Sequence, residues 1–127
     1  MRYRTHECGT LSLEMVGQKV VLNGWVNRRR DMGGVIFVDL RDRSGIVQVV
    51  FQPEISAEAA AVADRLRSEY VISVEGTIVE RDPETVNPKL KTGNIEVRAE
   101  QVEIINTAKT PPFPLDEQAE VDEGVRL

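Results

Sequence analysis

Apolar and polar residues alternate along most of the chain with the period of two that is typical of β-strands. With the enrichment in valine and isoleucine, this alternation predicts strands at residues 19–29, 35–42, 46–51, 70–80 and 95–105. In the last strand the apolar positions are odd up to Ala99 and even from Val102, which predicts a β-bulge between them. Gly24, inside the first strand, is typical of a bulge or a sharp bend. The buried face of the second strand is expected to carry Ile36, Val38 and Leu40.

The period changes after the third strand. Ser56 is a favourable N-cap, and the alanine-rich segment after it predicts a helix over residues 57–67. The order β-β-β-α-β-β is that of the OB-fold, an all-β five-stranded Greek-key barrel with one helix. Other five-stranded folds share this order. OB-folds bind oligonucleotides across strands two and three, with help from two loops, here residues 31–34 and 81–94.

We expect three regions along the chain. A polar arm, residues 1–17, precedes a barrel at residues 18–107. Residues 108–127 contain the stiff, proline-rich run KTPPFP at residues 109–114 and continue as an acidic tail.

Composition excludes several kinds of protein. The 127 residues make one domain, which is short for a complete two-substrate enzyme. No apolar run approaches the roughly 20 residues that span a bilayer, and the polar N-terminus lacks a secretory signal, so we expect a cytoplasmic protein without a membrane partner. The single cysteine, Cys8, and the single histidine, His6, supply no disulfide and no metal or catalytic set. We therefore expect neither a catalytic nor a metal site in this chain.

The net charge of −5 is unevenly distributed. Residues 115–127 carry five carboxylates and one arginine, which gives −4 and leaves the body nearly neutral. Residues 28–43 hold five arginines and three aspartates. A local basic stripe of this kind matters more for RNA contact than the total charge.

Two side chains on neighbouring strands are suited to contact with bases. Phe37 shares the polar face of its strand with Asp39 and Arg41, where an aromatic ring can stack on an unpaired base for about 1–3 kcal/mol. Gln48 lies on the outward face of the next strand, and its amide offers both a donor and an acceptor to a base edge. The alternatives are a phenylalanine packed beneath a loop and an ordinary surface glutamine. Because the two strands form a hairpin, a stacking residue beside a reading residue is the stronger hypothesis.

Charged residues extend this hypothesis. At least one of the three consecutive arginines of residues 28–30 must point to the base-binding side; the alternative is a solvated cluster paired with Asp31, Asp39 and Asp42. Glu96 lies opposite two apolar neighbours, so it either accepts hydrogen bonds from a base or is simply solvated. Mobile polar candidates in the second loop are Arg81, Asn87, Lys89 and Lys91.

Several separated strings carry a family resemblance. The longest, GWVNRRRDMGGVIFVDLRDRSGIVQVVFQP, closely resembles the first three strands of the N-terminal domain of bacterial aspartyl-tRNA synthetases. THECGTL, RSEYVISVEGTIVERD, TGNIEV and PPFPL are similar to the same family, in the same order. The resemblance covers essentially the whole chain. It implies an OB-fold domain that binds the anticodon loop of aspartate tRNA.

The resemblance also implies the role of particular residues. In this family the phenylalanine at Phe37 stacks on the middle anticodon uridine, the glutamine at Gln48 reads neighbouring bases, and the glutamate at Glu96 lies at the first anticodon base. Arg30, Arg81 and, on a weaker match, Asn87 are implied as further anticodon contacts. Met32 occupies a loop position that carries histidine in many members accepting asparagine tRNA as well, and leucine in many strict members. Methionine is closer to leucine, so strict reading is expected; the alternative is that Met32 only packs on the loop and residues 81–94 set specificity.

The full-length enzymes of this family are cytoplasmic homodimers that use ATP and magnesium to charge tRNA with aspartate. Their class II catalytic motifs belong after the linker, so we expect this chain to be an anticodon-binding domain without ligase activity of its own. Two alternatives remain. One is a free-standing OB-fold module for single-stranded nucleic acid, which the near-neutral body and single candidate stacking residue disfavour. The other is the domain of an asparagine or lysine enzyme.

Overall fold

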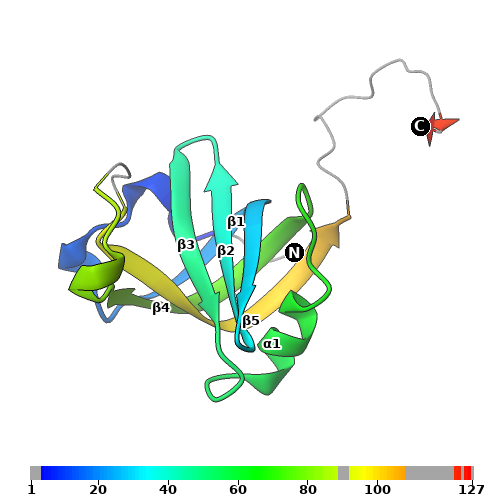
Figure 1. Cartoon of the computed structure of the whole chain (residues 1–127). Helices are drawn as coiled ribbons and strands as arrows, with labels where there is room; N and C mark the ends of the chain where they lie inside the picture. The colour runs from blue at the N-terminus through cyan, green and yellow to red at the C-terminus, as the bar shows by residue number, and fades with distance from the viewer. Residues whose placement is uncertain (1–3, 89–91, 108–121, 124, 127) are drawn as a thin grey trace.

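The computed structural model describes residues 4–88, 92–107, 122–123 and 125–126. Within them, five strands form a closed barrel (Figure 1): β1 (Lys19–Met32), β2 (Val35–Asp42), β3 (Gly45–Phe51), β4 (Val71–Glu80) and β5 (Ile95–Asn106). The order around the barrel is β1-β2-β3-β5-β4, and β4 pairs with β1 to close it. The β3–β5 pair is parallel and the other barrel pairs are antiparallel. The predicted OB-fold is confirmed.

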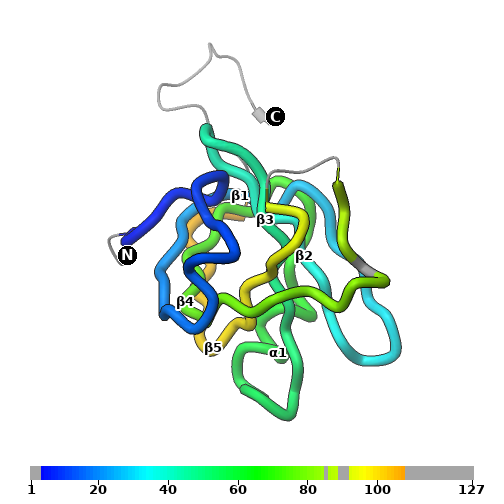
Figure 2. The backbone as a smooth tube through the Cα atoms, turned by 90° about the vertical axis from the view of Figure 1, so that its left-hand side faces the viewer, coloured from blue at the N-terminus to red at the C-terminus, as the bar shows by residue number. Residues whose placement is uncertain are grey.

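Short elements complete the chain. The helix α1 (Ala57–Ala63) joins β3 to β4 and lies at one end of the barrel (Figures 1 and 2). Single turns of 3-10 helix occur at η1 (Cys8–Thr10), η2 (Leu13–Met15) and η3 (Pro83–Thr85). Two-residue strands β6 (Asp122–Glu123) and β7 (Val125–Arg126) pair with each other. The rest of the expected linker and acidic tail lies outside the described residues.

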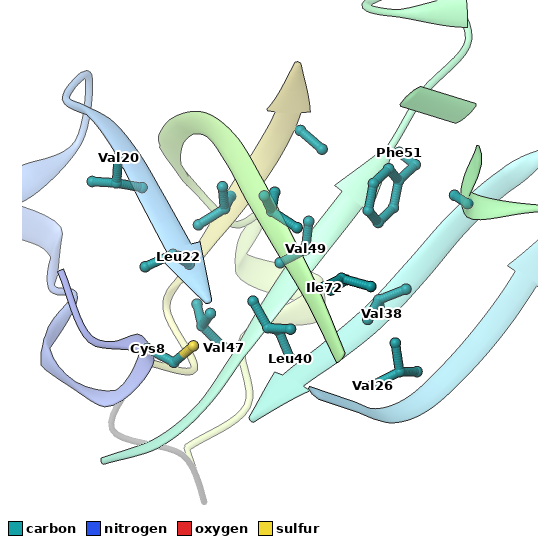
Figure 3. Close-up of a cluster of buried hydrophobic side chains, with 14 of the residues drawn as sticks. Cys8, Val20, Leu22, Val26, Val38, Leu40, Val47, Val49, Phe51 and Ile72 are labelled. Carbon is teal, nitrogen blue, oxygen red and sulfur yellow. The ribbon is translucent and has the colours of Figure 1, made fainter. Parts of the chain in front are cut away.

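The barrel interior is filled by every second residue of the strands, because a pleated strand turns alternate side chains to opposite faces. Ile36, Val38 and Leu40 are buried, as the alternation predicted. Figure 3 shows part of this core, with Cys8 toward one end of the cluster and Phe51 toward the other.

The N-terminal arm contributes to this core. Cys8 and Leu11 are buried in the same hydrophobic cluster, so residues before the first strand close one end of the barrel. The backbone N–H of Cys8 donates to an Asp42 carboxylate oxygen at 2.8 Å. Burial raises the pKa of the Cys8 thiol far above its ordinary value, which keeps it protonated and unreactive.

The first hairpin differs from the expected four-residue loop. β1 continues through Asp31 and Met32, so only Gly33 and Gly34 connect it to β2. Both glycines have positive φ, +67° and +92°, which is the backbone of the two-residue turn that matches the twist of a hairpin. Met32 therefore projects from a paired strand end, opposite Val35.

One of the two expected strand irregularities is confirmed and the other is displaced. In β5, Glu100 is the extra residue of a bulge between Ala99 and Gln101, and its carboxylate accepts a hydrogen bond from the Thr77 hydroxyl at 2.8 Å. In β1 the bulge lies at Asn27 and not at Gly24. Gly24 serves close packing instead: a Cβ there would lie 2.4 Å from the carbonyl oxygen of Arg41.

The helix begins as predicted and ends early. The backbone N–H of Ala59 donates to Ser56 Oγ at 3.1 Å, which confirms the N-cap. α1 ends at Ala63 and not at residue 67, because the chain then turns Leu66 into the core. The side chain of Arg29 donates to the carbonyl oxygen of Ala63 at 3.2 Å, which satisfies a helix-end acceptor.

Candidate nucleic-acid interface

The outward faces of β1, β2 and β3 bring the candidate residues into two cross-strand rows. In the first row, Phe37 pairs with Arg30 on one side and Val50 on the other. In the second row, Asp39 pairs with Arg28 and Gln48. Directly opposed side chains in such pairs lie close enough to interact.

Two adjacent cavities open on this face. The larger has a volume of about 420 Å³ and is lined by Arg28, Arg30, Met32, Phe37, Asp39, Gln48, Arg81 and Asn87. The smaller has a volume of about 270 Å³ and is lined by Phe37, Gln48, Val50, Gln52, Glu80, Asp82, Glu96 and Arg98. Phe37 and Gln48 line both. The six residues implied as anticodon contacts therefore lie around one pair of joined cavities.

A chain of hydrogen bonds crosses the site. Arg30 Nη2 donates to Gln48 Oε1 at 3.0 Å, and Gln48 Nε2 donates to Glu96 Oε1 at 3.0 Å. Gln48 is only 5% exposed, so it is not the ordinary surface glutamine of the alternative interpretation. Burial follows because β5 lies parallel beside β3 and places Glu96 against the amide. The amide orientation is thus set by a charged group at each end.

Glu96 is a half-buried carboxyl group. Burial raises its pKa above the ordinary 4.5, while the Gln48 hydrogen bond and the nearby Arg81 and Arg98 act to lower it. A folded-state pKa above the unfolded value contributes stability that is full below about pH 4.5 and is lost as pH rises through the folded pKa. The carboxylate becomes an acceptor-only group above that pKa.

Arg81 was expected to be a mobile loop residue, and the structure contradicts this. Its side chain is 7% exposed, and Nε donates to the carbonyl oxygen of Ile95 at 3.1 Å. Arg81 follows directly after the last residue of β4 and is held there, which no sequence pattern indicated. Burial lowers the pKa of its guanidinium, while the nearby Glu96 and Asp39 act to raise it.

The three consecutive arginines diverge. Arg28 and Arg30 line the larger cavity, and the Arg30 guanidinium carbon lies 5.8 Å from the centroid of the Phe37 ring. Arg29 points the other way and forms an ion pair with Asp64 at 3.6 Å. Within the described residues, this run makes no ion pair with the three aspartates considered from sequence.

The rim of the larger cavity comes from the end of β1 and from the loop after β4. Met32 is 61% exposed, and the backbone N–H of Asn87 donates to the carbonyl oxygen of Gly93 at 2.9 Å. Lys89 and Lys91 lie outside the described residues. The sequence hypothesis gave no reading role to Asp39 and singled out no particular role for Arg28, although both share the strand faces of Phe37 and Arg30.

The described parts of the chain contain neither a metal-ligand cluster nor a membrane-spanning helix. No group of three or more histidine, cysteine, aspartate or glutamate side chains there could hold a metal ion. No helix in those parts is long and apolar enough to cross a membrane.

Comparison with known proteins places the chain in a family. Residues 20–105 match the tRNA anti-codon family, an OB-fold nucleic acid binding domain. An aspartate–tRNA ligase of Geobacillus kaustophilus is 61% identical over 98% of this chain. An aspartate–tRNA(Asp/Asn) ligase of Geobacillus sp. WCH70 is 60% identical over the same share. The chain spans about a fifth of these relatives, 21% of each.

Solved structures of similar proteins show the same fold. The asparaginyl-tRNA synthetase from Pyrococcus horikoshii is 31% identical with a TM-score of 0.69, over 94% of this chain and 26% of that one. The OBody AM2EP06, bound to hen egg-white lysozyme, is 24% identical with a TM-score of 0.74 and shares the fold; the match covers 85% of this chain and 98% of that one. The chain therefore belongs to the tRNA anti-codon family of OB-fold nucleic acid binding domains, and over nearly its whole length it is homologous to a domain of aspartate–tRNA ligases.

Proposed function

We propose that this chain binds the anticodon loop of aspartate tRNA, as the anticodon-binding domain of an aspartyl-tRNA synthetase. One observation carries the proposal: Phe37, Gln48 and Glu96 meet between two joined cavities, with Gln48 held at both ends by hydrogen bonds. Proteins bind unpaired bases by stacking an aromatic ring on them and by hydrogen bonding to their edges. The phenylalanine can supply the first interaction, and the oriented amide and the carboxylate can supply the second.

Phe37 supplies the stacking surface. Its ring lines both cavities and is outside the core cluster, so a base in either cavity can lie against it. Base–aromatic stacking contributes about 1–3 kcal/mol and is available to every base. Phe37 therefore supplies affinity, and the polar neighbours supply the choice of base.

Gln48 and Glu96 together favour guanine in the smaller cavity. One Nε2 proton of Gln48 is used by Glu96, which leaves the second proton for a keto oxygen. The Glu96 carboxylate then accepts from neighbouring N–H groups. The Watson–Crick edge of guanine carries the matching groups side by side: the keto oxygen O6, then N1–H and the N2 amino group. This agrees with the position of Glu96 at the first anticodon base in the resembled family.

The longer protein to which this domain would belong is proposed to charge aspartate tRNA as a cytoplasmic homodimer. ATP and magnesium would be bound by its catalytic body, as the family resemblance implies. This chain's own contribution is to hold the anticodon loop, and no ligase chemistry is assigned to it. With Met32 at the hairpin end, we propose that aspartate tRNA is preferred over asparagine tRNA.

Calorimetric titration tests the proposal against the alternative of a non-specific single-strand module. The aspartate anticodon stem-loop, the same stem with a scrambled loop, and a single-stranded oligonucleotide are titrated over a range of salt concentrations. We expect clear preference for the aspartate loop and a shallow log–log salt slope, about −0.7 per phosphate neutralised. Equal affinity for all three with a steep slope would establish the non-specific module instead.

A further inference from the structure

A further cavity opens on a different face of the barrel, over β4 and β5. Its volume is about 230 Å³, and it is lined by Ser73, Glu75, Gln101, Val102 and Glu103. This face lies away from β2, the middle strand of the candidate nucleic-acid interface (Figure 2). Of the described residues that line the cavity, two are acidic and none is basic, so its charge repels the phosphates of RNA. The cavity is therefore suited to a cation.

The register of β4 and β5 sets the two carboxylates of this cavity on a diagonal. Ser73 pairs with Glu103, and Glu75 pairs with Gln101. Residues on such a diagonal lie about 7–8 Å apart, which leaves room for a flat group between the two carboxylates. Glu103 is exposed and Glu75 is partly buried. Their like charges repel each other, and a cation bound between them would replace this repulsion with attraction.

Ser73 forms the floor of the cavity. Its neighbours Ile72 and Val74 are buried in the core, so strand alternation turns the Ser73 side chain to the outward face, where it lines the cavity. Ser73 is only 2% exposed, and among the described residues its Oγ has no hydrogen-bond partner. A buried hydroxyl without a partner costs free energy, and a ligand that donates to it removes that cost.

Lys19, on the neighbouring strand β1, does not fill the cavity from within the chain. Its pKa is raised chiefly by the hydrogen bond with Glu100, and the charge of Glu75 adds to the shift. The Lys19 amine lies 3.0 Å from Glu100 Oε1, and neither of these two residues lines the cavity. The cation that the cavity would accept therefore comes from another molecule.

We propose that this cavity binds the guanidinium group of an arginine side chain presented by a partner polypeptide. The group lies between the carboxylates of Glu75 and Glu103 and donates one N–H to Ser73 Oγ. Guanidinium is planar and carries five N–H donors, which suits two carboxylates and a hydroxyl better than the compact ammonium of lysine does. The inference goes beyond the proposed function and stands without it, because it involves no RNA.

A second copy of this chain is a poor source of the arginine. Arg28 and Arg30 line the larger cavity on the other face, so a copy that used them would join two different faces of the barrel. Such a head-to-tail contact does not form a closed dimer. The partner is therefore a different polypeptide with an exposed arginine, and it can bind while an anticodon loop occupies the other face.

Titration of the ¹⁵N-labelled chain with N-acetyl-arginine amide, followed by NMR, tests the proposal. Saturable shifts are expected at the backbone amides of Ser73, Gln101 and Glu103. N-acetyl-citrulline amide has the same shape without the charge and should leave these amides unchanged. N-acetyl-lysine amide should bind more weakly, and so should free arginine, because the cavity repels its carboxylate. No shifts with the arginine amide, or equal shifts with the citrulline or lysine amide, would overturn the proposal. Tighter binding of free arginine would replace the polypeptide with the free amino acid.

Variants locate the binding. Glu103→Gln should weaken binding of the arginine amide about fivefold, the upper end for one exposed ion pair. Glu54→Gln removes an exposed carboxylate between β3 and α1 and, as the matched control, should bind like the wild type. Ser73→Ala should weaken binding without lowering the thermal midpoint, because its hydroxyl has no partner within the described residues. Undiminished binding by both Glu103→Gln and Ser73→Ala would place the arginine elsewhere and overturn the proposal.

Two further measurements separate the remaining outcomes. Sedimentation equilibrium should give a monomer, and a dimer that Glu103→Gln dissociates would assign the cavity to a second copy instead. Glu103→Gln should bind the aspartate anticodon stem-loop as the wild type does, so failure of this inference can be told apart from failure of the proposed function.

Discussion

Replacing Gln48 with alanine should destabilise the fold as well as impair base reading. The substitution removes two hydrogen bonds of 3.0 Å, each to a charged partner. Hydrogen bonds to charged groups contribute about 1.5–3 kcal/mol each, which sets an upper limit near 6 kcal/mol. Arg30 and Glu96 are only half-buried and regain part of their hydration, so we expect a loss of about 2–3 kcal/mol in the free energy of unfolding.

Thermal and urea unfolding followed by circular dichroism measure this effect. A loss of that size lowers the midpoint of a domain of this size by about 10–20 °C. Gln18→Ala is the control, because the Gln18 side chain is exposed and its substitution should change stability by less than about 0.5 kcal/mol. Equal stability of Gln48→Ala and wild type would show that the amide is not held between the two charges, and the guanine assignment would lose its basis.

Three further predictions concern binding. Phe37→Ala should weaken binding of the aspartate anticodon stem-loop by about 1–3 kcal/mol with little change in thermal midpoint; unchanged binding in calorimetry would remove the stacking role. Binding of that stem-loop should weaken as pH falls through the raised pKa of Glu96, because protonation removes the negative charge and turns one acceptor oxygen into a donor that faces the N–H groups of guanine. Glu96→Gln should abolish this pH dependence. A persistent dependence in that variant would assign the titration to another group. Met32→His should narrow the difference in affinity between aspartate and asparagine stem-loops, and an identical difference would exclude Met32 from the choice.

The strand faces could be predicted from sequence because period-two alternation directly reports which side chains are buried. The odd-to-even change predicted a bulge between Ala99 and Val102, and the structure places it at Glu100. Burial on the outward face could not be predicted in this way. Gln48 is covered because β3 and β5 pair in parallel, and no local pattern reports a pairing between segments so far apart in the chain.

The burial of Arg81 and the end of the helix α1 also could not be predicted from local sequence patterns. Arg81 follows a strand and reads as a solvated loop arginine, yet its guanidinium is held by the carbonyl oxygen of Ile95. The helix ended early because Leu66 is drawn into the core, which outweighs helix propensity at the end of a short segment. The candidate residues themselves were found through the family resemblance together with strand alternation, and their hydrogen-bonding order required the fold.

The proposed function requires that the anticodon loop occupies the joined cavities between β1, β2, β3 and β5. Titration of the ¹⁵N-labelled chain with the aspartate anticodon stem-loop, followed by NMR, tests it most directly. The largest changes are expected on the Gln48 side-chain amide and on backbone amides around Phe37 and Glu96. Changes confined to the opposite face of the barrel, around Ser73 and Gln101, would contradict it.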